Sequence, residues 1–253
     1  MFRVIQISDT HLTRGDARAI PGWNAALDHF ARSAPHLVIH TGDIANDPTS
    51  REERAFAMAE LGRIGAPLRV VAGNHDVGDT PPAPLSVTPE QLRQHEAAYG
   101  PSRWAEDIPG WRIIGINTQL LGTGLPAERN EWDFLTETLG GAGERDIAVF
   151  MHKPPFVFHP AEPQQTTAAV PIAARRRLWE QLKRARVRLV STGHRHEYRV
   201  THHDGIAVVW CPATALIPET TPPLAGSPLP ALIDFVFAPG SVAHTYVGLS
   251  HDR

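Results

Sequence analysis

Short apolar runs alternate with helix-like patterns through the first two thirds of the chain. The runs are rich in Val and Ile, and several lack polar alternation, as expected of strands that are covered on both faces. The sequence predicts six such strands: Phe2–Ile7, Leu37–His40, Leu68–Val71, Ile113–Ile116, Ile147–Met151 and Val187–Ser191. Strands that alternate with helices in this way indicate a layered α/β fold.

Five helices are predicted between these strands. Ser50 with Glu53 and Thr88 with Gln91 each form a capping box, and Asn24 is placed to cap an earlier helix. The last two helices are marked by apolar positions at helical spacing: Trp132, Leu135 and Leu139, then Leu178, Trp179 and Leu182. We expect these apolar positions to face inward.

The pattern changes after Gly193, where four strands follow one another without a helix. Asp204-Gly205 is a tight hairpin signal within this region. The predicted strands are Glu197–Thr201, Ile206–Trp210, Leu232–Phe237 and Val242–Val247. They predict a second, largely antiparallel set of strands that closes a single domain spanning residues 1–253.

Three proline-rich stretches are long for plain connections between elements. They cover residues 79–89, 153–171 and 212–230. We therefore expect each of them to be a candidate wall of an active site.

Composition and charge narrow the range of functions. A net charge of −3 over 253 residues argues against a nucleic-acid binder, because such proteins usually carry a basic balance. Cys211 is the only cysteine, which excludes an internal disulfide and a cysteine-built zinc site. No apolar run approaches the about 18 residues of a membrane span, and the N-terminus shows no signal-peptide pattern. We expect a soluble, cytoplasmic protein with no membrane partner.

Five polar segments stand out among the 14 histidines, and most of them follow a predicted strand. In open α/β sheets, ligands bind outside the carboxyl ends of the strands, so segments at these ends are expected to converge. The five segments are Asp9-Thr10-His11, Gly42-Asp43, Gly73-Asn74-His75-Asp76, His152 and Gly193-His194-Arg195-His196. The glycines before the polar residues are expected to let the backbone turn sharply.

The side chains of these segments suit divalent metal ions. Two carboxylates, one amide oxygen and several imidazoles, with no thiolate, favour Mn, Fe, Co or Zn. The seven candidate ligands are Asp9, His11, Asp43, Asn74, His152, His194 and His196. One metal rarely takes seven such ligands, whereas two metals that share a bridging carboxylate would use them all. Paired metals ~3.5–4 Å apart clamp the attacking and leaving oxygens of a displacement at phosphorus.

This series of motifs (D-x-H, G-D, G-N-H-[DE], a single H and G-H-x-H) resembles the calcineurin-like metallophosphoesterase superfamily. The resemblance covers roughly Met1 to Val209 and extends to the closing strands. It implies a four-layer α/β/β/α sandwich, in which two central mixed sheets are flanked by helices and a dinuclear site lies between the sheets. It also implies that Asp9, His11 and His196 hold one metal, that Asn74, His152 and His194 hold the other, and that Asp43 bridges them.

The expected chemistry follows from that arrangement. Metal coordination lowers the pKa of bound water from about 15.7 towards 7, so a bridging hydroxide would attack phosphorus at neutral pH. Asn74 would help to offset negative charge on the phosphoryl oxygens. The resemblance makes His75 a residue that contacts the phosphate and assists the leaving group, and Asp76 is expected to orient its imidazole.

The substrate class is expected to be a small-molecule phosphoester. The opening strand followed by Asp-Thr-His-Leu most resembles class III cyclic nucleotide phosphodiesterases and bacterial glycerophosphodiesterases, which favours phosphodiesters. The segment Ile116–Leu121 looks like broader phosphatases, so a phosphomonoesterase is the alternative. Other metallohydrolases do not fit the positions of the histidines. A non-catalytic scaffold would lack some ligands, and a nuclease lacks support from a basic stripe.

Other polar residues are weaker candidates for a role in binding or catalysis. Arg195 and Lys153 are expected to be solvated or structural, although either cation could meet a phosphate. Among the remaining histidines, only His159 is placed to face a substrate. The basic run from Arg175 to Arg177 is expected on the exposed start of a helix.

Overall fold

The computed structural model describes residues 1–81, 83–215 and 229–249, and two β-sheets organise them. The first sheet has the order β11-β10-β1-β2-β3, with β1 (Phe2–Ile7), β2 (Leu37–His40), β3 (Leu68–Val70), β10 (Ala231–Ala238) and β11 (Ser241–Gly248). The second has the order β4-β5-β6-β7-β9-β8, with β4 (Trp104–Ile108), β5 (Trp111–Ile116), β6 (Asp146–Met151), β7 (Leu189–Thr192), β8 (Arg199–His203) and β9 (Ile206–Trp210).

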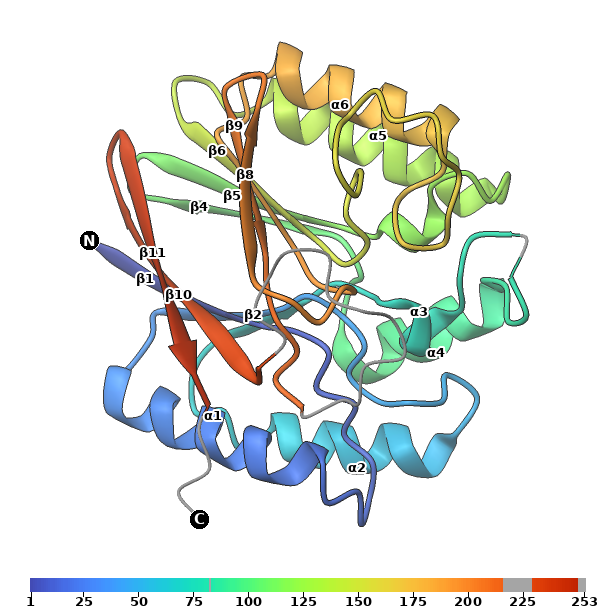
Figure 1. Ribbon diagram of the computed structural model, residues 1–253, viewed down its shortest axis with the longest axis vertical. Helices are drawn as coiled ribbons and strands as arrows, with labels where there is room; N and C mark the ends of the chain where they lie inside the picture. The colour runs from blue at the N-terminus through green and yellow to red at the C-terminus, as the bar shows by residue number, and fades with distance from the viewer. Residues whose placement is uncertain (82, 216–228, 250–253) are drawn as a thin grey trace.

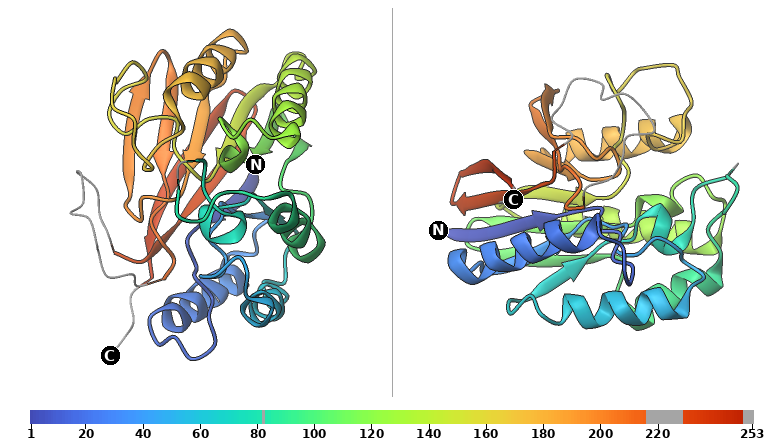
Figure 2. Two further views of the ribbon diagram at one scale, coloured as in Figure 1. Left: turned by 90° about the vertical axis from the view of Figure 1, so that its right-hand side faces the viewer. Right: turned by 60° about the horizontal axis from the view of Figure 1, so that its bottom comes forward.

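Helices cover the outer faces of both sheets. Their bounds are α1 (Ala19–Ser33), α2 (Arg51–Leu61), α3 (Asn74–Val77), α4 (Pro89–Tyr99), α5 (Pro126–Gly140) and α6 (Ile172–Arg184), with a 3-10 turn η1 (Thr118–Leu120). Helices α1 and α2 lie beneath the first sheet, and α5 and α6 lie above the second (Figures 1 and 2). The predicted α/β/β/α sandwich with two mixed sheets is confirmed.

The alternation of side chains along each strand explains the four layers. In β1, Val4 packs between the sheets, whereas Ile5 and Ile7 pack against α1 and α2. In β6, Phe150 points between the sheets, and its neighbour Val149 packs against α5 and α6. Strands with apolar side chains on both faces therefore need helices outside and a second sheet inside.

The closing strands correct one prediction. They do not form a separate set, because β8 and β9 join the second sheet while β10 and β11 join the first. Strand β10 pairs antiparallel with β1, and β9 pairs parallel with β7. Both sheets are thereby extended by the end of the chain, and β10 lies beside β1.

Two elements differ from the sequence predictions for physical reasons. Helix α1 begins at Ala19 without a side-chain cap, so the predicted cap at Asn24 is wrong. Ala19 and Trp23 are both buried, and this packing extends the helix by more than a turn beyond the local signal. Strand β4 was not predicted because its sequence alternates and includes two acidic residues. It is an edge strand that pairs antiparallel with β5.

Two predictions for single residues are also corrected. Arg175 is buried rather than exposed, and its guanidinium donates to the backbone oxygens of Glu162 (3.0 Å) and Gln164 (3.2 Å). Arg175 therefore fastens the proline-rich stretch 153–171 onto α6. The ring of His159 lies 5.4 Å from that of His203 on β8 (centroid to centroid), so it contacts a strand rather than the polar segments.

Most of the third proline-rich stretch, residues 212–230, lies outside the described residues. Within the described part of the chain, no helix is both long enough and apolar enough to cross a bilayer.

Candidate metal centre

The strand-end segments converge at one edge of the two sheets, as predicted. Backbone hydrogen bonds tie them together: Asp9 N donates to Gly42 O (2.9 Å), and Gly193 N donates to His152 O (3.0 Å). Two groups of metal-ligating side chains result, and within each group the ligand atoms lie within 4.8 Å of one another. The groups are Asp9, His11, Asp43 and His196, then Asp43, His152 and His194. Asp43 belongs to both groups.

The backbone is strained at most of these positions. Eight non-glycine residues in the described part of the chain have a positive φ, and five of them are predicted ligands. The five are Asp9 (φ 52°), His11 (45°), Asp43 (56°), His194 (71°) and His196 (54°). Such conformations cost ~1 kcal/mol or more each, and they persist where the surrounding structure enforces them, typically at functional sites.

The glycines of the motifs have two different roles. Gly42 has a φ of 97° and turns the backbone sharply, as predicted. Gly73 has a φ of −101° and makes no such turn. A Cβ there would collide with the Asp43 carboxylate, and a Cβ at Gly193 would collide with the Ser8 hydroxyl. These two glycines are needed because the segments approach closely.

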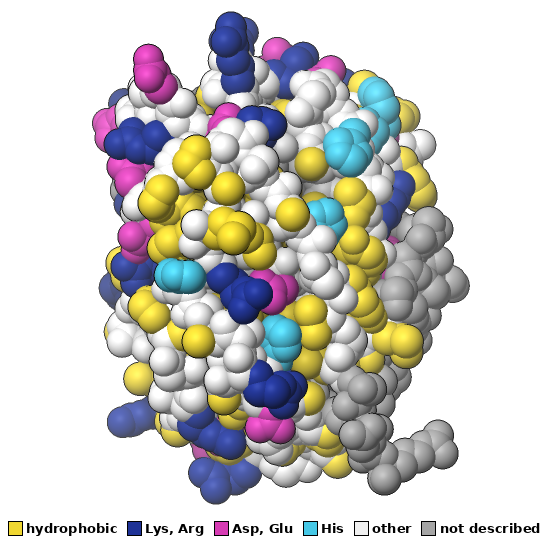
Figure 3. Space-filling model, turned by 90° about the vertical axis from the view of Figure 1, so that its left-hand side faces the viewer, with side chains coloured by type: hydrophobic (Ala, Val, Ile, Leu, Met, Phe, Trp, Pro, Cys, Tyr) yellow, Lys and Arg dark blue, Asp and Glu magenta, His cyan; other side chains and the backbone are white. Residues whose placement is uncertain are grey.

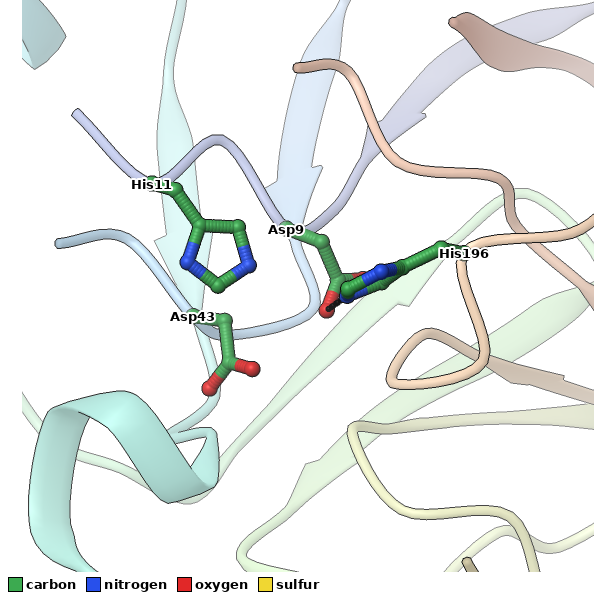
Figure 4. A group of neighbouring side chains, drawn as sticks. All are labelled: Asp9, His11, Asp43 and His196. Carbon is green, nitrogen blue, oxygen red and sulfur yellow. Dashed lines mark ion pairs between the residues drawn. The ribbon is translucent and has the colours of Figure 1, made fainter. Parts of the chain in front are cut away.

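The first group of ligands contains buried acceptor atoms that lack a partner. His11 Nδ1 lies 2.8 Å from Asn46 Oδ1 and donates to it, so Nε2 keeps a lone pair. That Nε2 is buried and has no hydrogen-bond partner among the described residues. Asp9 Oδ1 lies 3.2 Å from His196 Nε2. Figure 4 shows these side chains and Asp43 pointing toward one another. The arrangement fits a bound cation.

In the second group of ligands, two imidazoles and an amide also direct acceptor atoms toward one point. His152 Nδ1 donates to the Thr41 carbonyl (2.7 Å), and His194 Nε2 donates to the Thr167 carbonyl (3.0 Å). The remaining nitrogens, His152 Nε2 and His194 Nδ1, lie 3.2 Å apart. Asn74 Oδ1 lies 3.1 Å from His152 Nε2. Backbone carbonyls thus orient both rings with one nitrogen toward a common point, as in metal sites.

The electrostatics show that the centre attracts positive charge. Burial opposes ionisation of Asp43, but the neighbouring His152 holds the pKa of Asp43 well below its usual range. Burial also opposes protonation of His152, yet the Asp43 and Asp9 carboxylates raise the pKa of His152 to about 9. Burial lowers the pKa of His11 to about 4, which keeps that imidazole neutral. A divalent cation ligated by these groups would displace the His152 proton.

His75 lies beside the ligands and is not held by Asp76. Its Nδ1 lies 2.7 Å from the Asn46 carbonyl, and its backbone N–H donates to Asp43 Oδ1 (2.8 Å). Burial opposes protonation, but the Asp43 carboxylate and the Asn46 carbonyl raise the pKa of His75. Asp76 instead accepts hydrogen bonds from the backbone N–H groups of Asp43 (2.8 Å), Ile44 (2.9 Å) and Gly73 (2.8 Å). The predicted orientation of His75 by Asp76 is therefore corrected.

Asn46 is a functional candidate that the sequence analysis missed. Its side chain contacts His11 and its carbonyl contacts His75, so one residue orients two imidazoles. Glu53 in turn accepts a hydrogen bond from the Asn46 backbone N–H (3.1 Å). The only signal for Asn46 in the sequence is its position three residues after Asp43. No general spacing rule identifies a residue at that distance as functional.

Lys153 is structural, in line with the sequence interpretation. Its side chain is buried and forms an ion pair with Asp79. Asp79 was not singled out by the sequence, because only the fold brings it to Lys153.

Comparisons with known proteins agree with this geometry. The family pattern described as calcineurin-like phosphoesterase matches residues 2–198. The chain is 27% identical over 164 residues to the 3',5'-cyclic adenosine monophosphate phosphodiesterase of Pseudomonas aeruginosa, which covers 60% of this chain and 55% of that protein. It is 30% identical over 166 residues to a probable glycerophosphodiester phosphodiesterase of Arcobacter nitrofigilis, which covers 60% of this chain and 57% of that protein. Each match thus spans little more than half of the relative.

A solved structure shares the fold over almost the whole chain. A dimetal phosphatase from Danio rerio superposes with a TM-score of 0.66, covering 98% of this chain and 96% of that one. The sequence identity is 14%, so this likeness concerns the fold alone.

Proposed function

Because the chain belongs to the calcineurin-like phosphoesterase family, we propose that it is a phosphoric ester hydrolase, which hydrolyses small-molecule phosphodiesters with two divalent metal ions. One observation carries the dinuclear part of the proposal: the two groups of ligands share Asp43. A carboxylate with two oxygens can bind one ion through each. The names of the two curated relatives support a diester as the substrate.

Seven residues would hold the two ions. Asp9, His11 and His196 would bind one ion, Asn74, His152 and His194 would bind the other, and Asp43 would bind both. The ligand set of carboxylate, imidazole and amide suits Mn, Fe, Co or Zn. Bound there, the ions would supply Lewis acidity and lower the pKa of a water molecule.

Side chains of the protein would bind the phosphoryl group and assist the leaving oxygen. Asn74 carries an amide that can donate to a phosphoryl oxygen while its Oδ1 faces the ligands. His75 is fixed through Nδ1 by the Asn46 carbonyl, so its Nε2 is the atom that can give a proton or a hydrogen bond to the leaving oxygen. Asp76 accepts hydrogen bonds from the backbone N–H groups of Gly73 and Asp43, and so fixes the position of these two segments relative to each other.

A nuclease role receives no support from the charge distribution. The net charge of −3 argues against a long basic track, and the face drawn in Figure 3, on the side of the molecule where β1 begins, shows basic and acidic side chains interspersed with hydrophobic ones. A long nucleic acid would need such a track to neutralise its phosphates.

Initial rates on two chromogenic esters test the proposal. Metal-stripped protein is reloaded with Mn²⁺ and assayed with bis(p-nitrophenyl) phosphate and with p-nitrophenyl phosphate. We expect metal-dependent hydrolysis that favours the diester. Asp43→Asn should abolish both the activity and the uptake of two metals, whereas Asp47→Asn, an exposed aspartate on the same loop, should change neither.

Each other result has a defined meaning. Faster hydrolysis of the monoester would make the protein a phosphatase and contradict the diester proposal. No turnover of either ester with two metals bound would contradict the proposed activity altogether.

A further inference from the structure

Two buried polar side chains next to the first group of ligands, Thr10 and His40, have no part in the proposed catalysis. Thr10 lies between Asp9 and His11 in the chain, and His40 ends strand β2, three residues before Asp43. The exposed fraction is 1% for Thr10 and 0% for His40. A buried imidazole needs hydrogen-bond partners for its nitrogens, so the partners of His40 indicate its role.

Three hydrogen bonds connect these two side chains to the backbone in one direction. The Gly42 N–H group donates to His40 Nδ1 (3.1 Å), so Nδ1 carries a lone pair and the proton lies on Nε2. His40 Nε2 therefore donates to Thr10 Oγ1 (2.8 Å). The Thr10 hydroxyl in turn donates to the Ile44 carbonyl (3.1 Å). Both ring nitrogens of His40 are thus used within the chain, and neither is free for a metal ion.

The path of these hydrogen bonds links three of the candidate ligands. It begins one residue before Asp43, ends one residue after it, and passes through the residue between Asp9 and His11. Backbone hydrogen bonds join the same two loops, from Asp9 N to the Gly42 carbonyl (2.9 Å) and from His11 N to the Asp43 carbonyl (3.1 Å). The side-chain bonds therefore add to the restraint on both loops.

The backbone of the ligands requires such a restraint. The φ angles of Asp9, His11 and Asp43 are 52°, 45° and 56°. Non-glycine residues adopt this region at a cost in free energy, and they remain there only where neighbouring contacts enforce it. Thr10 and His40 have no positive φ. Residues with an ordinary backbone conformation thus provide the side-chain contacts that hold their strained neighbours.

We propose that Thr10 and His40 are positioning residues, whose hydrogen bonds hold the first group of ligands in its metal-binding conformation before a metal ion arrives. We call this set of three hydrogen bonds the Thr10–His40 clamp. The inference rests on the proposed function, because it concerns the binding of metal ions to that group. Without the clamp, binding of a metal would have to order the loops and restore the strained backbone, and this cost should lower the affinity.

Two substitutions at Thr10 test the clamp. Thr10→Val keeps the shape of the side chain but removes the hydroxyl that contacts His40 and Ile44, whereas Thr10→Ser keeps the hydroxyl. On titration of Mn²⁺ into metal-free protein, we expect Thr10→Val to bind about tenfold more weakly than the wild type. Thr10→Ser should recover most of the affinity, because the hydroxyl rather than the methyl group makes the hydrogen bonds.

Thr214→Val is the matched control. Thr214 is 0% exposed, and its backbone N–H donates to the carbonyl of Ser8 (2.8 Å), the residue before Asp9. The Thr214 hydroxyl has no hydrogen-bond partner among the described residues. The substitution therefore removes a buried hydroxyl near the same loop without removing a hydrogen bond. The affinity for Mn²⁺ should stay at the wild-type value.

The order of the loops in metal-free protein gives a readout that depends on neither turnover nor metal. Relaxation of ¹⁵N measured by NMR yields the order parameters of the Asp9 and His11 N–H groups. We expect values of about 0.85 in the wild type and in Thr214→Val, and of about 0.6 in Thr10→Val. The amides of strand β6 should keep values of about 0.85 in all three proteins, because a general loss of stability does not change fast motions of the folded state.

Every other result has a defined meaning. Equal Mn²⁺ affinities of the wild type and Thr10→Val, or equal losses in Thr10→Val and Thr214→Val, would overturn the proposal. Unchanged order parameters of Asp9 and His11 in metal-free Thr10→Val would also overturn it. If the wild type binds no Mn²⁺, the proposed function fails, and the order parameters still decide whether the clamp orders the loops. If Thr10→Val does not fold, Thr10→Ala takes its place, because the smaller side chain leaves space beside the His40 ring.

Discussion

Two buried polar clusters, one around Gln6 on β1 and one around Asp9 just after that strand, differ in how their hydrogen bonds are satisfied. Gln6 is fully buried between the sheets, where its amide donates to Thr41 Oγ1 (2.9 Å) and accepts from Ser191 Oγ. Asp9 is equally buried, yet its Oδ1 is paired with an imidazole nitrogen, His196 Nε2 (3.2 Å), and the neighbouring His11 Nε2 has no hydrogen-bond partner among the described residues. The hydrogen bonds of the first cluster are satisfied within the chain, whereas the second presents acceptor atoms that the proposed metal ions would bind.

This difference separates a structural role from a functional one. A satisfied polar cluster between sheets fixes their relative position, and its loss should cost stability without touching chemistry. A cluster rich in acceptor atoms is stabilised by a bound cation. Loss of such a cluster should lower metal binding and activity. Four changes test this distinction, beginning with the largest expected effect.

Removal of metal should affect the Asp9 cluster most. We expect chelation to lower diester hydrolysis at least ~100-fold. Because a ligand that binds only the folded state stabilises it, Mn²⁺ at 100 times its Kd should raise the free energy of unfolding by about 2.7 kcal/mol. Urea unfolding with and without Mn²⁺ measures this increment. Equal unfolding free energies would contradict a metal site, and Asp43→Asn should lack the increment that Asp47→Asn retains.

Gln6→Leu should produce the opposite pattern. The change removes the hydrogen bonds between the Gln6 amide and the Thr41 and Ser191 hydroxyls, and we expect a loss of about 2 kcal/mol in the free energy of unfolding. Metal content and the rate per folded molecule should not change. Gln164→Leu, at an exposed glutamine in a loop, should alter stability by less than about 0.5 kcal/mol. If the fully folded Gln6→Leu protein bound less metal than the wild type, the Gln6 cluster would not be purely structural. The distinction between the two clusters would then be wrong.

Asn46→Ala should act between these extremes. It removes the amide that orients His11, while the backbone carbonyl that contacts His75 remains. Residues that orient metal ligands typically contribute 10–100-fold, and we expect about a tenfold loss of metal affinity. Titration of Mn²⁺ into metal-free protein measures it, with Asn130→Ala on the exposed face of α5 as the control. Unchanged affinity would show that Asn46 does not position His11.

Glu131 is a third kind of buried polar group, a carboxyl outside the set of candidate ligands, and its replacement should have the smallest effect. Its Oε1 accepts from Asn117 N (2.8 Å), and burial raises the pKa of Glu131 to about 7. The folded state then holds the proton more tightly than the unfolded state, whose pKa is near 4.5. This contribution is complete below pH 4.5 and is lost as the pH rises through about 7.

Glu131→Gln removes that titration. Relative to the wild type, the variant should become more stable by about 1 kcal/mol as the pH rises from 6 to 8. Urea unfolding of both proteins at the two pH values measures the gain. Parallel pH dependence of the two proteins would contradict it.

The convergence of the candidate ligands could be predicted from the sequence because these residues occupy short motifs, most of them directly after apolar strands. The carboxyl ends of neighbouring strands must meet, so residues such as Asp9 and Asp43 converge whatever the details of packing. The helix start at Asn24 failed because a local capping signal is weaker than burial of Trp23. Asp76 failed as a partner of His75 because its carboxylate serves three backbone N–H groups. Asn46 and Asp79 act through contacts that only the folded chain creates.

The positive φ angles of the candidate ligands affect which substitutions the backbone tolerates at these positions. At Asp9, His194 or His196, replacement by Ala would keep the unfavourable backbone, whereas replacement by Gly would relax it. Glycine at these positions would therefore cost less stability than alanine while removing a candidate ligand. A copy of this chain released from selection for catalysis would tend to drift toward glycine at these positions and keep its fold.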